Sequence, residues 1–303
     1  MRIMAAGLRF PEGPIAMADG SVLLVEIERE TLSRVTPDGK IEVVAEIPGG
    51  PNGAAMGPGG KVYVCNNGGF GWHYESGYMR PHGIPDTYTS GSIDVVDIAT
   101  GKVERLFDQC NGNKLNGPND LVFDTHGGFW FTDLGKRRAR DRDQGFIYYA
   151  KADGSEIREV IPMMLTPNGI GLSPDGKTLY VAETDTARVW AFEITGPGEV
   201  RKAPWPSPYG GRLLAGLGGY RRFDSLGISA SGAVCVAGVD SCSIVEIAPN
   251  GQVLREHWVP DNMVTNIAFG GPDLRTAYVT CSYRGVLFEL DWHEPGLRLE
   301  YQN

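Results

Sequence analysis

Six polar residues recur at one position of a repeated sequence pattern, and their types point to cation chemistry. Each begins a short run that is followed by a glycine-containing turn and then by an apolar, strand-like run; in chain order they are Glu12, Asn52, Asn119, Asn168, Asp224 and Asn266. Carboxylate and amide oxygens are hard ligands that suit Ca²⁺, Mg²⁺ or Mn²⁺. One such residue would more simply cap a turn through its own backbone. Six at equivalent positions favour a functional polar ring.

The elements that must position these residues are short β-strands. Each repeat continues with a third and often a fourth apolar run, and turn sequences such as PDG, HGG and PNG separate them. Four short strands per repeat are typical of a propeller blade. We therefore predict an all-β, six-bladed β-propeller that forms one domain over residues 1–303. The first strand of each blade would line the central channel, so the six polar residues would surround one mouth of it.

One feature of this architecture remains open at the level of sequence, and two alternative folds are disfavoured. Either residues 2–6 or residues 297–301 could supply the last outer strand that closes the ring. An open β-sandwich is disfavoured because six equal repeats do not divide naturally between two sheets. Helical repeats are disfavoured because the apolar residues lack the i, i+3, i+4 spacing.

Composition agrees with a β-rich chain and excludes several other classes. The chain has 42 glycines and 20 prolines, about a fifth of its length against an average near 12%, so turns must be frequent. The net charge of −9 argues against nucleic acid as a partner, and the basic run KRRARDR at 136–142 is interpreted as a solvated loop. Five cysteines without a CxxC pair indicate small buried hydrophobes. No stretch resembles a membrane span or a signal peptide, so a cytoplasmic location is expected.

Four segments carry a resemblance to a known family. The sequences RFPEGP (9–14), GPNDLVFD (117–124), TPNGIGLSPDGKTLYVAET (166–184) and DSLGIS (224–229) resemble the regucalcin/gluconolactonase family of six-bladed propeller lactonases. The resemblance implies one divalent ion, Ca²⁺ in the first place with Mg²⁺, Mn²⁺, Zn²⁺ or Fe²⁺ as alternatives. Its implied ligands are Glu12, Asn168 and Asp224, while Asn119 joins the ion or contacts substrate.

The same resemblance implies hydrolysis of a small lactone, such as a sugar-acid lactone. The ion would act as a Lewis acid on the carbonyl, and Asp224 would also serve as general base. Several members place an arginine two residues before the third-blade asparagine to hold the sugar, but this chain has Gly117 there. Two alternatives remain: an organophosphate or ester hydrolase that uses the same ion, and a non-catalytic scaffold with a structural metal.

Substrate contacts are predicted from the ring and from the largest insertion. Residues 66–90 lie between the second and third strands of the second blade and are rich in aromatic residues. Such an insertion is either a lid over the mouth or a self-packed Ω-loop. The candidate substrate contacts are Asn52, Asn119, Asn266, His73, Tyr74 and His82. The other histidines are not predicted to contact substrate. His126 should be exposed in a turn, and His257 and His293 should serve packing near outer strands.

Overall fold

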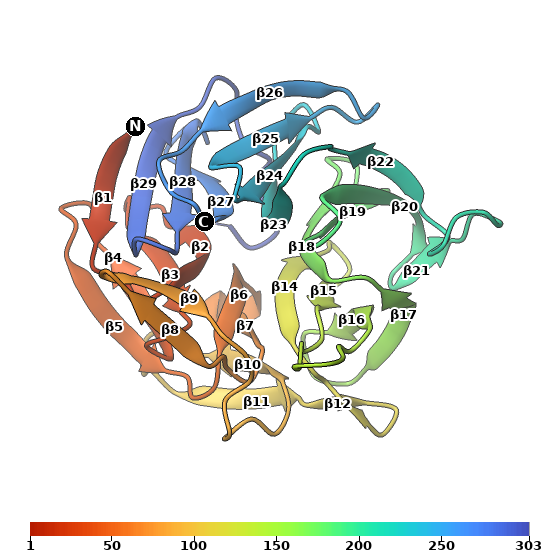
Figure 1. Ribbon diagram of the computed structural model, residues 1–303, viewed down its shortest axis with the longest axis horizontal. Helices are drawn as coiled ribbons and strands as arrows, with labels where there is room; N and C mark the ends of the chain where they lie inside the picture. Colours follow the sequence, from red (N-terminus) through yellow and green to blue (C-terminus); the bar gives the residue numbers. More distant parts are fainter. Residues whose placement is uncertain (303) are drawn as a thin grey trace.

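The computed structural model describes residues 1–302 and contains six antiparallel sheets of four or five strands arranged in a ring (Figure 1), besides two small two-stranded sheets. This confirms the predicted six-bladed β-propeller. The first three blades, each given from its inner to its outer strand, are β2 (Pro11–Ala16), β3 (Val22–Glu26), β4 (Thr31–Val35) and β5 (Ile41–Glu46); β6 (Pro51–Met56), β7 (Val62–Asn66), β10 (Ser92–Val96) and β11 (Val103–Phe107); and β14 (Pro118–Phe123), β15 (Gly128–Asp133), β16 (Gly145–Lys151) and β17 (Ile157–Met164).

The remaining blades follow the same order with one addition. They are β18 (Pro167–Leu172), β19 (Thr178–Glu183), β20 (Arg188–Gly196) and β21 (Glu199–Arg201), with β22 (Arg212–Gly216) also paired to β20; β23 (Arg222–Ile228), β24 (Val234–Val239), β25 (Ser243–Ile247) and β26 (Val253–Trp258); and β27 (Val264–Gly270), β28 (Thr276–Cys281), β29 (Val286–Asp291) and β1 (Arg2–Ala6). Within residues 1–302 the only helical element is the 3₁₀ turn Pro58–Gly60, and no helix is long and apolar enough to span a bilayer.

The ring is closed by the N-terminal strand. β1 pairs antiparallel with β29, with Arg2 opposite Glu289 and Ala6 opposite Val286. The C-terminal segment instead runs across one face of the propeller, where the Tyr301 ring meets the Phe123 ring edge-on at 5.2 Å between centroids. Of the two closures left open by the sequence, the structure uses residues 2–6.

The hydrophobic core lies between neighbouring blades. The second strand of each blade is buried on both faces, which explains why these strands are continuous apolar runs rather than alternating ones; all residues of β3, β7 and β24 are buried. Each apolar cluster joins two blades: one combines Leu23 of blade one with Val64 of blade two. The five cysteines are free, and Cys65, Cys235 and Cys281 are buried within these strands as expected.

Candidate functional site

The six predicted polar residues occupy equivalent places on the six inner strands. Each is the second or third residue of its strand, at the end that faces one mouth of the channel. The residues Glu12, Asn52, Asn119, Asn168 and Asp224 line one pocket of about 220 Å³. Asn266 lines a second cavity further along the channel and reaches the first pocket through a hydrogen bond to Glu12.

A break in strand pairing presents each polar side chain to the channel. In blades one to five the ladder between the first and second strands loses register beside the polar residue, for example between Glu12 and Ile15 and between Pro167 and Ile170. Blade six has the same irregularity between Val264 and Asn266. β-Bulges of this kind redirect side chains and are common near active sites.

Glycine lets the inner strands approach each other at this level. Gly13 has a φ of +52°, and a Cβ on it would lie 2.6 Å from the Ala54 nitrogen. Gly169, which follows Asn168, packs equally closely on the next inner strand, where a Cβ would lie 2.7 Å from the Leu226 nitrogen. The glycines of the EGP and PNG motifs therefore keep the ring narrow.

Glu12 is buried and held from two directions. Its Oε2 atom accepts hydrogen bonds from the Gly13 nitrogen at 2.8 Å and from the Asn266 side-chain amide at 3.0 Å. The amide oxygen of Asn266 accepts a hydrogen bond from the Ile267 nitrogen. Both ends of the Asn266 amide are thus engaged, so in this structure Asn266 orients Glu12 and its assignment as a substrate contact remains a prediction.

The remaining ring oxygens are less fully engaged. Asn168 donates from Nδ2 to the Thr184 hydroxyl at 3.0 Å, which leaves its Oδ1 atom with a long 3.4 Å contact to the Ser225 hydroxyl. Asn119 is buried, and its Oδ1 atom has no hydrogen-bond partner among the described residues. A buried carbonyl oxygen without a donor is costly unless something else satisfies it.

The carboxylates of the ring resist ionisation when no cation faces them. Burial and the nearby charge of Asp224 raise the pKa of Glu12 well above its usual range. Burial raises the pKa of Asp224 to about 7, against the opposing effects of the Asn168 amide and the Arg222 guanidinium. Asp224 is nevertheless partly accessible from the pocket, so water and solutes can reach it.

A buried aspartate fixes the segment that leads to Asn119. The Asp133 carboxylate accepts hydrogen bonds from the backbone nitrogens of Asn116, Gly117 and Gly135. Gly117 packs so tightly here that a Cβ on it would lie 2.8 Å from the Gly135 oxygen. The backbone therefore leaves no room for a side chain at position 117, so the sugar-holding arginine that the resemblance implied cannot be accommodated there without a backbone shift.

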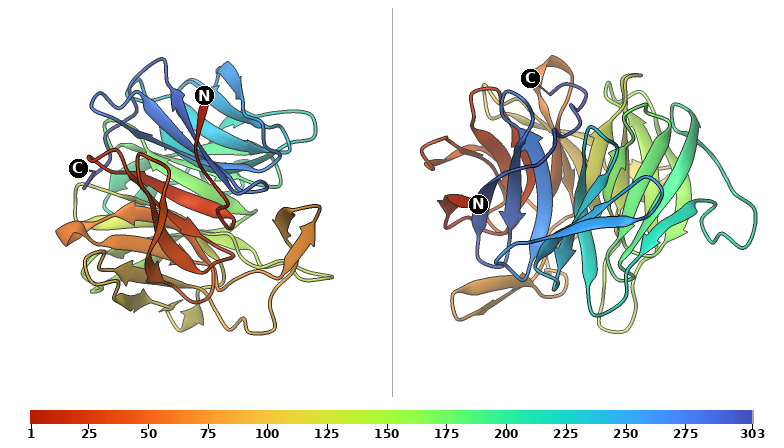
Figure 2. Two further views of the ribbon diagram at one scale, coloured as in Figure 1. Left: turned by 90° about the vertical axis from the view of Figure 1, so that its left-hand side faces the viewer. Right: turned by 90° about the horizontal axis from the view of Figure 1, so that it is seen from above.

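The insertion at residues 66–90 contains a hairpin, β8 (Trp72–Glu75) and β9 (Tyr78–Pro81), that projects from one face of the disc (Figure 2). The C-terminal segment lies on the opposite face (Figure 2). Phe70 and Pro81 line the pocket, and the Tyr78 ring stacks on the Tyr283 ring at 4.4 Å. The hairpin thus lies on the predicted side and reaches across to blade six.

The three insertion residues predicted to bind substrate lie on the outside of this hairpin. His73 and His82 are exposed, with ring centroids 6.1 Å apart. Tyr74 donates a hydrogen bond to Glu28 and is also exposed. Their role as substrate contacts remains a prediction, and it would require the hairpin to move inward.

The basic run at 136–142 is not a fully solvated loop, which corrects the interpretation from sequence. Lys136, Arg137 and Arg142 line the pocket together with Arg222. Lys136 is only 3% exposed; its Nζ atom donates to the Gly69 oxygen at 2.7 Å and to Asn67 Oδ1 at 3.2 Å. The charge pattern of the run could not predict that Lys136 is buried, because its hydrogen-bond partners lie almost seventy residues earlier in the chain.

Lys136 joins the base of the insertion to the third blade. Its ammonium also lies over the Phe70 ring at 4.6 Å and the Tyr88 ring at 5.0 Å. Cation–π contacts of this kind add to the hydrogen bonds when the ammonium is desolvated. The pocket wall and the insertion are therefore one packed unit at this point.

Burial of Lys136 predicts a specific pH dependence of stability. Burial lowers its pKa from 10.5 to about 7. Between these values the unfolded chain binds a proton that the folded chain does not, so the free energy of unfolding should rise with pH by up to about 1.4 kcal/mol per pH unit. Below about pH 7 this contribution to the slope disappears. A Lys136→Met variant should lack it, and urea unfolding of both proteins across this range measures the difference. If the free energy of unfolding changed with pH in the same way in both proteins, the prediction would be contradicted.

Fold and site together define a six-bladed propeller with a carboxylate–amide ring at its axis. Residues 10–283 match the family model described as the SMP-30/gluconolactonase/LRE-like region. The chain belongs to this family, as its motifs suggested.

Sequence identity to individual relatives is low, although each alignment covers more than half of this chain. A gluconolactonase from Zymomonas mobilis is 23% identical over 94% of this chain and 80% of its own length. A 6-deoxy-6-sulfogluconolactonase from Pseudomonas putida is 29% identical over 59% of this chain and 58% of its own. The calcium-binding protein regucalcin from Agrobacterium tumefaciens has the same fold, with a TM-score of 0.73 at 20% identity, covering 98% of this chain and 97% of that one.

Proposed function

We propose that this protein hydrolyses a small lactone at the channel mouth with the help of one divalent cation. The observation that carries the proposal is the ring itself: Glu12, Asp224 and Asn119 line one pocket, and the buried Oδ1 atom of Asn119 has no hydrogen-bond partner among the described residues. The gluconolactonase relatives support the reaction class.

The donor set fits a hard cation better than it fits any alternative. The charge of Asp224, together with burial, raises the pKa of Glu12 and so disfavours its ionisation, and two carboxylates neutralise a dication. Asn119 Oδ1 and Asn168 Oδ1 add neutral oxygens. Oxygen donors of this kind are typical of Ca²⁺, Mg²⁺ or Mn²⁺ sites, and Ca²⁺ is our first choice.

The chain's own residues supply binding and proton transfer. When bound, the cation polarises the lactone carbonyl and stabilises the negative charge that develops on its oxygen. Asp224 accepts the proton of the attacking water and then returns it to the ring oxygen as the C–O bond breaks. Glu12 serves as a ligand, and Asn266 together with the Gly13 nitrogen keeps its carboxylate oriented. Phe70 and Pro81 shield the pocket from one side.

The direct test is a metal-replacement assay with a lactone panel. Protein stripped by a chelator is assayed on aldonolactones, simple γ-lactones, aryl esters and organophosphates after Ca²⁺, Mg²⁺, Mn²⁺, Zn²⁺ or Fe²⁺ is added back. We expect loss of hydrolysis on stripping and recovery with at least one ion. Turnover of aryl esters or organophosphates but no lactone would favour the alternative hydrolase, and no turnover of any substrate would favour a scaffold with a structural metal.

The cationic side of the mouth predicts a preference for anionic lactones. Among residues 1–302 no carboxylate pairs with Arg137, which is exposed at the edge of the pocket, whereas Arg142 and Arg222 are paired with Asp185 and Asp240. An exposed charge pair contributes about 0.2–1 kcal/mol. The sulfonated substrate in the name of one relative is of this anionic kind.

Arg137→Gln should therefore raise KM for a lactone with a carboxylate, sulfonate or phosphate group by up to about fivefold. Its kcat should not change, because the contact is the same in the ground state and the transition state. The matched control is Arg138→Gln, since Arg138 is already paired with Asp141 and Asp143 and does not line the pocket. An equal change in KM for a neutral lactone would show that Arg137 does not recognise the negative charge of the substrate.

A further inference from the structure

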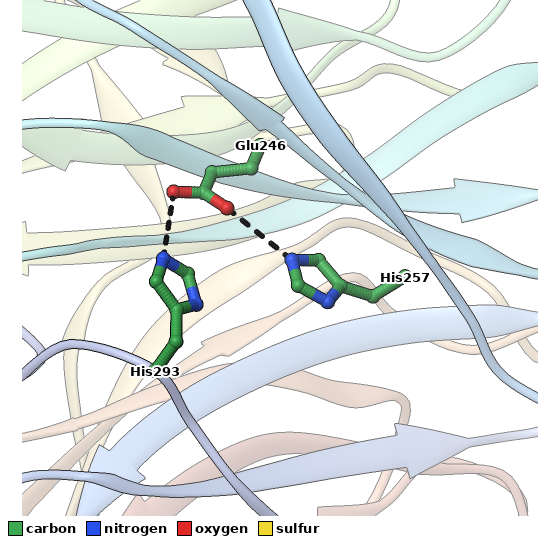
Figure 3. A group of neighbouring side chains, drawn as sticks. All are labelled: Glu246, His257 and His293. Atoms are coloured by element: carbon green, nitrogen blue, oxygen red, sulfur yellow. Dashed lines mark hydrogen bonds and ion pairs between the residues drawn. The ribbon is translucent and has the colours of Figure 1, made fainter.

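A second group of metal-ligating side chains lies at the outer surface, far from the channel. Glu246, His257 and His293 meet there (Figure 3). The two Glu246 carboxylate oxygens contact different imidazoles: Oε2 lies 3.2 Å from Nε2 of His257, and Oε1 lies 3.2 Å from Nε2 of His293. The ligand atoms of all three residues lie within 4.8 Å of one another.

The propeller brings these residues together from two blades. Glu246 is on β25, and His257 is on the outermost strand β26 opposite Ile244, so both side chains project from the same face of blade five. His293 follows β29 of blade six. The two histidines were expected to serve packing, and they do contact Trp292, whose ring lies 4.3 Å from that of His257. Their shared contact with Glu246 goes beyond packing.

The group is organised but accessible. Glu246 is 1% exposed, whereas the side chains of His257 and His293 are 26% and 35% exposed. The nearly parallel imidazole rings lie 5.8 Å apart, and Trp292 is itself buried between them and the inter-blade core. Both imidazole side chains are therefore partly open to solvent, while the Glu246 carboxylate is buried.

We infer that Glu246, His257 and His293 form a binding site for a Zn²⁺-like transition-metal ion. Two imidazole nitrogens and one carboxylate oxygen are a common zinc ligand set that leaves one position for water, and imidazole selects such ions over Ca²⁺. The site differs in donor chemistry and position from the all-oxygen ring of the channel. Its ligands come from blades five and six, so a bound ion links these two blades.

Two charged side chains near the site, Arg255 and Glu294, should affect how tightly it binds an ion. The Arg255 guanidinium lies 3.7 Å from Glu246 Oε2 and is 54% exposed, so it can turn into solvent when an ion arrives. The second carboxylate nearby, Glu294, lies 3.9 Å from Nε2 of His293. Removing the arginine charge should strengthen ion binding. If Glu246 and Arg255 formed only a structural ion pair, the substitution would remove that pair without strengthening ion binding.

The experiment measures Zn²⁺ binding to the full-length, tag-free protein by calorimetry, with thermal unfolding as a second readout. We expect one micromolar or tighter site that survives Asp224→Asn and a rise in Tm of at least about 3 °C at saturating Zn²⁺. His257→Gln and His293→Gln should each weaken binding at least tenfold and abolish the Tm rise. Because both side chains are partly exposed, the Tm without zinc should change little, and lactone hydrolysis should be retained.

His126→Gln is the matched control, since His126 is exposed in a distant turn, and it should bind Zn²⁺ like the parent protein. Arg255→Gln should bind Zn²⁺ more tightly than the parent protein does. Absorption bands of tetrahedral Co²⁺ in the parent protein, lost in both histidine variants, would support the assignment. The inference is overturned if the parent protein binds no Zn²⁺ at micromolar concentrations, or if the two histidine variants bind it as the parent does.

Discussion

Asp224→Asn is expected to lower kcat/KM for lactone hydrolysis by about 10²–10⁴-fold, because an amide cannot accept the proton of the attacking water. The substitution conserves size, and the side chain lies at the partly accessible wall of the pocket. It also removes one of the two charges that face the cation. Steady-state kinetics on the best lactone of the panel, with the cation at saturation, measure the effect.

Two controls separate this loss from a general effect of losing a carboxylate. Asp153→Asn makes the same chemical change in an exposed turn, where Asp153 accepts hydrogen bonds from Ser155, and it should leave kcat/KM within about twofold of the parent value. The Tm of Asp224→Asn without added cation should equal or exceed that of the parent. Full activity of Asp224→Asn at saturating cation would remove Asp224 from the role of base.

Glu12→Gln is expected to weaken binding of the cation by at least about a hundredfold and to abolish hydrolysis at ordinary cation concentrations. The glutamine keeps the acceptor for Gly13 and Asn266 but lacks the charge that a dication requires. Calorimetric titration with Ca²⁺ or Mn²⁺ measures the affinity directly.

The same variant should make the cation-free protein more stable. Burial and the charge of Asp224 both oppose ionisation of Glu12, so a neutral side chain of the same size removes a cost that folding must otherwise bear. We expect a gain of about 0.5–2 kcal/mol in the free energy of unfolding without cation. A variant that is both less stable and inactive would indicate that Glu12 is structural.

The repeat pattern predicted the ring because each blade repeats the same local chemistry. The placement of Glu12, Asn168 and Asp224 follows from the number of blades and the position of each residue on its inner strand. Even the irregular pairing beside them is local, since it recurs in blade after blade. A sixfold repeat thus carries information about tertiary structure that a single motif lacks.

What the sequence could not predict are contacts between residues far apart in the chain. In the sequence, Lys136 belongs to a basic run that is typical of a solvated loop. Its ammonium is buried beside Gly69 because the insertion at residues 66–90 packs against it. The triad of Glu246, His257 and His293 spans two blades with no common motif. Closure of the ring depended on whether β1 or the C-terminal segment fitted β29 better, which is a matter of packing rather than of propensity.

The central claim is that one divalent cation binds to Glu12, Asn119, Asn168 and Asp224. Anomalous diffraction from crystals grown with Mn²⁺ tests it most directly, because the manganese position is located without reference to the protein atoms. The account predicts a peak at the channel mouth within coordination distance of these four side chains. A map with no peak on the channel axis, or with manganese only beside Glu246, would contradict it.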